Sequence, residues 1–342
     1  GVVDKRQLYV VLIAISSAVI PAIPACFSGN TATTKESGTD NIRIKEYIFN
    51  ETDVPEISDE PYKVLDITSG QVLTVPVRDY IIGAVCAEMP ASFETEALKA
   101  QAVTAHTYAE RQRNIERESP SSELCGADFS NDTSKYQGYL TDSQIQYYYG
   151  SNYDEYYKKI SSAVDDVLPY ILTFNSEPAI AAFHSMSSGK TESAENMWGT
   201  PVEYLVPVDS SYDTSAPRYM EEVRIDKSAL KTRLENVFEG LKLSYDATEW
   251  VVPAEISESG TVLTALLGDT VVTGNEIRSA LGLRSADFDV KYTDTEVIFT
   301  TKGFGHGVGM SQYGANAMAK EGKSWQDILN HYYTGCEITK TE

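Results

Sequence analysis

One acidic residue, Glu88, stands where a predicted apolar helix ends. Within residues 80–87 the apolar residues Ile81 and Val85 recur at helical spacing, and Pro90 stops the helix just beyond the glutamate. The helix dipole and the apolar neighbours both disfavour a negative charge at that end, so Glu88 is expected to hold its proton longer than a free glutamate does. A carboxyl group that keeps its proton is what a general acid needs.

A second helix is predicted from residue 94 to about residue 117, and two polar side chains interrupt its apolar stripe. Gln101 and Tyr108 fall on the same face as the small apolar residues. If residues 90–93 join the two helices in a hairpin, both side chains can reach Glu88 or a ligand bound beside it. The alternative is a capped hairpin with a surface glutamate and a buried glutamine whose hydrogen bonds are satisfied in the core.

Glycines alternate with larger residues between Gly303 and Gly309. The backbone there can approach a ligand closely while His306 projects from it. This pattern is typical of a binding loop, and a glycine-rich turn with a structural histidine is the alternative. The spacing matches no common phosphate-binding motif.

His184 lies among several serines, an arrangement that invites comparison with serine hydrolases. No nucleophile-elbow pattern surrounds these serines, and hydroxyl-rich loops are more often turns or ligand donors. A zinc site drawn from the histidines and cysteines of the chain lacks ligand spacing on any one element. Both hydrolase classes are therefore disfavoured.

The chain has 342 residues, enough for one large core or two modest ones. Its net charge of -22 argues against nucleic acid or anionic lipid as the main partner, because both require a positive surface. An uncharged or weakly charged ligand fits better. The 22 tyrosines supply rings that can line a groove and donate hydrogen bonds at its rim.

Residues 8–27 carry no charge and follow two basic residues. The run is long enough to span a bilayer with its basic flank in the cytoplasm, so residues 1–27 are expected to form a membrane anchor. A cleaved signal peptide ranks second and a lipoprotein signal at Cys26 ranks third. Residues 28–60 are polar and predict a flexible linker, which leaves residues 61–342 as a domain outside the cytoplasm.

The four cysteines show no close pairing along the chain. Cys26 belongs to the apolar segment, and Cys86 belongs to the buried face of the first helix. Cys125 and Cys336 are left. A disulfide between them can form in an exported protein, but the sequence does not establish it.

Hydrophobic periodicity predicts an α+β fold of helices and short strands, with the helical hairpin carrying Glu88. A second, smaller α/β lobe is expected as an insertion around residues 215–290. The other expected elements are short strands within 61–76, an irregular tyrosine-rich stretch from 122 to 157, a helix at 153–167, strands at 170–174 and 179–183, a helix at 227–238, a helix through 319 and a helix at 325–333.

Several blocks of this sequence resemble one known family. They are residues 87–93 (AEMPASF), 96–103 (EALKAQAV), 183–192 (FHSMSSGKTE), 281–285 (LGLRS) and 305–315 (GHGVGMSQYGA). The blocks are long and specific, and they place nearly all of residues 60–340 within a resemblance to the stage II sporulation protein D family.

The resemblance implies a lytic transglycosylase that cuts peptidoglycan glycan strands between N-acetylmuramic acid and N-acetylglucosamine without water. Glu88 would protonate the glycosidic oxygen and then take the proton of the muramic 6-hydroxyl, leaving a 1,6-anhydro end. One carboxyl group can serve both steps. If a second carboxylate were required, as in two-carboxylate hydrolysis, the nearest candidates are Glu192, Glu203 and Asp209.

The resemblance also implies which residues line the groove and hold the sugar, with no metal and no cofactor. They are Gln101, Tyr108, Gln137, Tyr139, His184, Ser188, His306, Ser311 and Gln312. The implied partners are peptide-denuded glycan strands, a sporulation cell-wall amidase and other engulfment proteins. The implied location is the cell membrane, with the catalytic domain in the intermembrane space of the sporangium.

Two departures from the family pattern limit the transfer of roles. His106 stands where the family usually has arginine, so a salt bridge there would become a weaker, pH-sensitive contact. Some members bind zinc through cysteine and histidine just before their glutamine motif, whereas residues 130–137 lack such ligands, so no zinc is expected there. The main rival function is a noncatalytic peptidoglycan-binding protein that recruits or activates an amidase.

Overall fold

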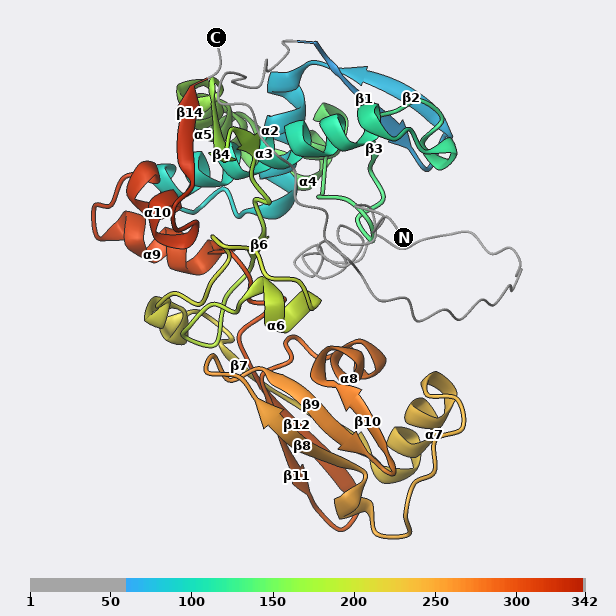
Figure 1. Cartoon of the computed structure of the whole chain (residues 1–342). Coiled ribbons are helices and arrows are strands. Elements are labelled where there is room, and N and C mark those ends of the chain that lie inside the picture. Colours follow the sequence, from blue (N-terminus) through green and yellow to red (C-terminus); the bar gives the residue numbers. More distant parts are fainter. Residues whose placement is uncertain (1–59, 341–342) are drawn as a thin grey trace.

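The computed structural model describes residues 60–340. These residues form two lobes joined by a narrower middle layer, with the N-terminal helices in one lobe and strands β7–β12 in the other (Figure 1). The structure has both helices and several small sheets, which confirms the α+β fold class. The predicted anchor and nearly all of the predicted linker lie outside the described residues. Within residues 60–340, no helix is long and apolar enough to cross a membrane.

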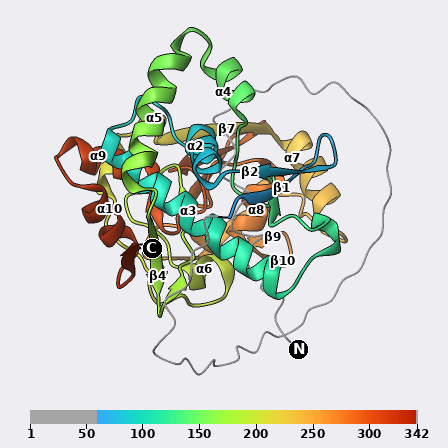
Figure 2. The ribbon, with the colours of Figure 1, turned by 90° about the horizontal axis from the view of Figure 1, so that it is seen from above.

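Helix α3 (Thr95–Glu118) is the central element of the helical lobe and crosses it from side to side (Figure 2). It packs against α2 (Val77–Glu88), α5 (Tyr153–Val167) and α9 (Gln312–Lys320). Small residues such as Ala97, Ala102 and Ala105 are fully buried along it. Alanine favours the helix and leaves room for close neighbours, so α3 can be covered on several sides.

Small sheets flank these helices. Strands β1 (Tyr62–Asp66) and β2 (Gln71–Val75) form a hairpin, and β3 (Phe129–Ser130) pairs parallel to β1. Strand β4 (Tyr170–Phe174) lies between β14 (Glu337–Lys340) and β5 (Glu177–Pro178), so the last strand within residues 60–340 returns to the helical lobe. The remaining helices here are α4 (Asp142–Tyr149) and α10 (Trp325–Tyr332).

The middle layer contains β6 (Phe183–His184), which pairs parallel to β13 (Met310–Ser311), and the short helix α6 (Ala194–Trp198). This pairing brings the histidine and serine block at residue 184 beside the glycine-rich block that precedes β13. Helix α9 begins directly after β13 at Gln312. Two motifs more than 120 residues apart in sequence therefore meet in this layer.

The second lobe has its own hydrophobic core, which includes Ile225, Leu230, Ile277 and Phe299. One sheet has the order β11-β12-β7 and the other has the order β10-β9-β8. The lobe's elements are β7 (Met220–Asp226), α7 (Lys227–Val237), β8 (Val251–Ile256), β9 (Val262–Leu267), β10 (Thr270–Thr273), α8 (Gly274–Leu281), β11 (Phe288–Tyr292) and β12 (Glu296–Lys302). Strand β12 lies wholly beyond residue 290 and pairs along its whole length with β7, so the lobe continues past the expected boundary.

Two local expectations were wrong. The strand expected at 179–183 is limited to Phe183–His184, because the segment before it runs through the core without a pairing strand. The stretch expected to be irregular contains α4, which begins with a capping box between Thr141 and Gln144. That signal was present in the sequence, since threonine followed by glutamine at the third residue is a helix start.

Candidate functional site around Glu88

Glu88 is the last residue of α2, as predicted, and its side chain is half-buried. The backbone N–H of Gly138 donates a hydrogen bond of 2.6 Å to its Oε1. Gly138 can come this close because it has no Cβ: a Cβ there would lie 2.7 Å from the same oxygen. The carboxylate is thus fixed by a loop fifty residues further along the chain.

The neighbours of Gly138 hold this loop on the helical hairpin. The Gln137 amide donates to the Tyr80 hydroxyl at 3.0 Å and to the carbonyl of Ala105 at 3.2 Å. The ring of Tyr139 stacks on that of Tyr80 with centroids 5.0 Å apart. Gln137 and Tyr139 therefore position the backbone donor that meets Glu88, and their contact with a sugar stays a prediction.

Gln312 joins the end of α2 to the start of α9. Its side-chain amide donates to the backbone carbonyl of Glu88 at 2.9 Å and to Oε1 of Gln101 at 3.3 Å. The last carbonyls of a helix lack intrahelical partners, so this bond also caps α2. The structure thus brings together Glu88, Gln101 and Gln312 at one point. Tyr108 is also buried, two helical turns further along α3.

Two influences act on the Glu88 carboxyl group in opposite directions. The Gly138 N–H stabilises the ionised form, because it donates to a carboxylate oxygen. The C-terminal end of α2 stabilises the protonated form, because the helix dipole is negative there. This balance suits a group that first gives and then takes a proton. The expectation that Glu88 holds its proton longer than a free glutamate stays a prediction.

His184 and His306 face one another in the middle layer, with ring centroids 5.7 Å apart. Nδ1 of His184 donates to the carbonyl of Val308 at 3.1 Å, and the N–H of Val308 donates to Nδ1 of His306 at 3.1 Å. Burial lowers the pKa of His184 to about 4 and holds the pKa of His306 well below its usual value. Both rings are therefore neutral near pH 7 and fix the glycine-rich loop, and neither supplies a positive charge.

Two residues that were predicted to contact the sugar, Ser188 and Ser311, form hydrogen bonds within the protein. The Ser188 hydroxyl donates to the carbonyl of Ser259 in the second lobe at 2.6 Å. The Ser311 hydroxyl caps α9 by accepting from the N–H of Gly314 at 3.0 Å, and it donates to Asp213 at 2.7 Å. In this arrangement Ser188 connects the middle layer to the second lobe, and Ser311 orients the helix that carries Gln312.

Asp213 is a buried residue that the sequence analysis missed. Its Oδ2 accepts from the N–H and hydroxyl of Ser187 at 2.7 and 2.6 Å and from the hydroxyl of Ser210 at 2.9 Å, while Oδ1 accepts from Ser311. Burial raises the pKa of Asp213, although these hydroxyl groups act against the shift. The carboxylate binds the serine block to the start of α9, and no short motif around residue 213 marks this role.

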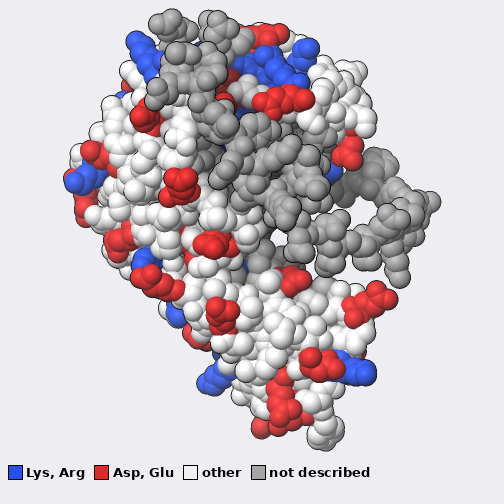
Figure 3. All heavy atoms as spheres, in the orientation of Figure 1, with Lys and Arg blue, Asp and Glu red and all other residues white. Residues whose placement is uncertain are grey.

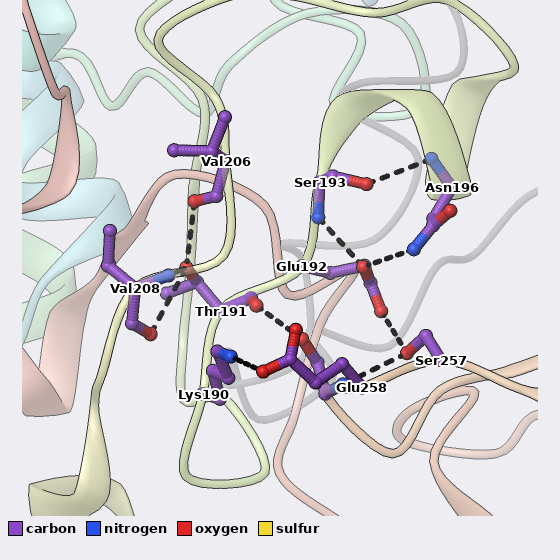
Figure 4. Close-up of polar contacts among 10 residues, drawn as sticks. Lys190, Thr191, Glu192, Ser193, Asn196, Val206, Val208, Ser257 and Glu258 are labelled. Carbon is purple, nitrogen blue, oxygen red and sulfur yellow. Dashed lines mark hydrogen bonds and ion pairs between the residues drawn. The ribbon is translucent and has the colours of Figure 1, made fainter.

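Three carboxylates were named as candidates for a second catalytic carboxylate beside Glu88. In the structure each of them has other partners or is exposed. Glu192 is buried where the middle layer meets the second lobe, and it accepts there from the Asn196 amide at 2.9 Å and from the Ser257 hydroxyl at 2.5 Å (Figure 4). Glu203 is exposed, and the exposed Asp209 accepts from a neighbouring hydroxyl at 3.0 Å. Glu192 therefore joins the middle layer to the second lobe.

His106, the departure from the family pattern, lies in a buried ionic cluster. Its Nε2 is 3.7 Å from Oε1 of Glu110, and the Arg113 guanidinium lies 2.6 Å from both oxygens of that carboxylate. Burial raises the pKa of Glu110, but His106, Arg113 and the Tyr62 hydroxyl together hold it below its usual value. The contact made by His106 is longer than that of Arg113, in line with a weaker interaction.

In residues 60–340, no group of three histidine, cysteine or acidic side chains is arranged to hold a metal ion. Cys86, Cys125 and Cys336 are free thiols in the structure, so the bridge considered between Cys125 and Cys336 is not formed. Acidic side chains are spread over both lobes on the face shown in Figure 3 and do not gather in one patch.

The comparisons with known proteins give consistent matches. A family model described as "Stage II sporulation protein" matches residues 66–174. A stage II sporulation protein D of Bacillus subtilis (strain 168) is 38% identical over 273 residues, which cover 79% of this chain and 76% of the relative. One from Bacillus amyloliquefaciens is 38% identical over 290 residues, covering 84% and 82%. A Bacillus subtilis protein named amidase enhancer is 26% identical over 308 residues, covering 75% and 40%.

Proposed function

Because this chain belongs to the stage II sporulation protein D family, we propose that it is a lytic transglycosylase acting on peptidoglycan glycan strands during engulfment in endospore formation. It would cut the bond from N-acetylmuramic acid to N-acetylglucosamine in strands without stem peptides. We further propose a membrane anchor at residues 1–27 and a catalytic domain that faces the intermembrane space.

In the proposed reaction Glu88 carries both proton transfers. Its carboxyl group protonates the glycosidic oxygen as that oxygen leaves the anomeric carbon. The resulting carboxylate then accepts the proton of the muramic 6-hydroxyl, whose oxygen closes onto the same carbon. The products are a sugar with a free hydroxyl and a 1,6-anhydro end, and Glu88 is protonated again.

The observation that supports this proposal best is the hydrogen bond from Gly138 to the Glu88 carboxylate at the end of α2. A backbone donor keeps one oxygen in a fixed place in both protonation states of the group, and Gln312 fixes the helix end below it. Because the two oxygens belong to one rigid carboxyl group, fixing Oε1 also restricts where Oε2 can lie. Such fixed positioning is what makes acid–base catalysis by one group effective.

The rival proposal is a noncatalytic protein that binds peptidoglycan and recruits or activates a cell-wall amidase. It is favoured by the similarity to the relative named amidase enhancer. The two proposals make opposite predictions for Glu88. In the rival, replacing Glu88 leaves the effect on the amidase unchanged.

The test is digestion of amidase-treated, peptide-free glycan strands by the purified protein and by Glu88→Ala, with products identified by mass spectrometry. We expect anhydro-ended fragments from the native protein and a loss of about 10²- to 10⁴-fold in the variant, because general acid–base catalysis contributes that much. Reducing ends would indicate hydrolysis. Retained binding of strands without any cleavage would favour the amidase-recruiting protein.

A further inference from the structure

A cavity of about 630 Å³ opens beside the end of α2. Its walls come from the turn after α2, from one side of α9 and from residues 212–217. Pro90, one of its lining residues, follows Glu88 by two positions, so their Cα atoms are at most about 7 Å apart. Gln312 connects the same two walls, because it bonds to Glu88 and begins α9. The cavity therefore lies beside the site around Glu88.

Aromatic rings and polar groups share the lining of this cavity. The rings of Tyr313 and Phe93 meet edge to face with centroids 5.1 Å apart. The Tyr212 hydroxyl donates to Oε2 of Glu321 at 2.7 Å, which holds the third ring in place. Asn316 also lines the cavity. A sugar ring has apolar C–H faces and polar hydroxyl edges, so mixed walls of this kind suit it.

Lys320 is the one charged residue in the lining of this cavity. Its side chain is exposed, and among residues 60–340 its ammonium group forms no ion pair. Glu321, the next residue, is not part of the lining and accepts from Tyr212. A positive group beside the site is notable in a chain of net charge -22, because that net charge repels anions.

We propose that this cavity binds an N-acetylmuramic acid residue of the strand, with its free lactyl carboxylate paired to Lys320. This inference rests on the proposed function and identifies the residue that would select the substrate. The stem peptide of peptidoglycan is joined to the lactyl group by an amide, which is uncharged. Only a strand without that peptide presents the carboxylate, so Lys320 would favour denuded strands.

The test measures binding without cleavage, in the Glu88→Ala background. The ligands are a denuded tetrasaccharide of alternating N-acetylglucosamine and N-acetylmuramic acid and the same tetrasaccharide with its carboxylates converted to methylamides. At low salt we expect the free acid to bind about two- to fivefold more tightly, the range for an exposed ion pair. Added salt should remove the difference, because an exposed pair is screened.

Lys320→Gln in the same background should bind both ligands equally. Lys323→Gln is the matched control, because Lys323 is also exposed but does not line the cavity, and it should keep the preference. Equal binding of the two ligands by the parent protein, a preference that survives Lys320→Gln, or no binding of either ligand would each overturn the inference. Failure of cleavage alone would overturn the proposed function and leave this result standing.

Discussion

One added methyl group at Gly138 tests whether the position of the Glu88 carboxylate matters. A Cβ at residue 138 would lie 2.7 Å from Oε1 of Glu88 and 3.1 Å from the Cβ of Ala87. None of its three nearest neighbours is a backbone atom, and Gly138 does not have a positive φ. The end of the Glu88 side chain is the part that can yield, so Gly138→Ala displaces the carboxylate.

These contacts set the expected size of two effects of Gly138→Ala, one on the reaction rate and one on the free energy of unfolding. Oε1 must retreat by roughly 1 Å to reach an ordinary contact distance, and a misplacement of about 1 Å can cost about 10²-fold in rate. The free energy of unfolding should change by less than about 1 kcal/mol. The weakened hydrogen bond costs about 1 kcal/mol, and the loss of glycine's freedom in the unfolded chain returns a similar amount.

The assay is the initial rate of anhydro-end formation, with urea unfolding of each protein alongside it. Gly126→Ala is the control, because a Cβ there meets nothing within 4 Å but is strained by a φ of +84°. It should lose about 1 kcal/mol of stability and keep its activity. If Gly138→Ala folds as stably as the native protein and also cleaves as fast, the proposed role of the Gly138 donor is wrong.

Two further predictions concern two buried carboxylates, Asp213 beside the serine block and Asp287 just before β11 in the second lobe. Asp213→Ala should lower the free energy of unfolding by about 3 kcal/mol, because the buried donors of Ser187 lose a charged acceptor, and urea unfolding measures this. Burial raises the pKa of Asp287 from 3.8 to about 6 despite Lys302 at 3.7 Å, so the folded state binds the proton more tightly. The free energy of unfolding of the native protein should therefore fall by about 3 kcal/mol, relative to that of Asp287→Asn, as pH rises from about 4 to about 6. If the free energies of unfolding of the two proteins change in parallel with pH over this range, the raised pKa of Asp287 is wrong.

Local signals in the sequence were sufficient to place several elements. The helix expected at 153–167 is α5, and the helix expected to stop before Pro90 does end at Glu88. These results follow from helical periodicity, capping and the effect of proline on the preceding residue, all of which act within a few positions. Helix α4 lies in a stretch that was expected to be irregular, although its capping box is a local signal of the same kind.

The residues predicted to line the groove show how much of a side chain's role can be inferred from a sequence motif. Gln101 and Gln312 do meet beside Glu88. Ser188 and Ser311 belong to the same motifs but bond to Ser259 and Asp213 instead. A motif gives the identity of a residue, whereas the direction of its side chain depends on neighbours from distant parts of the chain.

The sequence by itself determined where the long helices lie and that a carboxyl group ends α2, because those features depend on residues close together along the chain. The tertiary structure alone decided what surrounds that carboxyl group. The Gly138 donor comes from 50 residues away and the Gln312 amide from 224 residues away. Such contacts form when long loops close and lobes pack together, and no local pattern of residue types encodes that geometry.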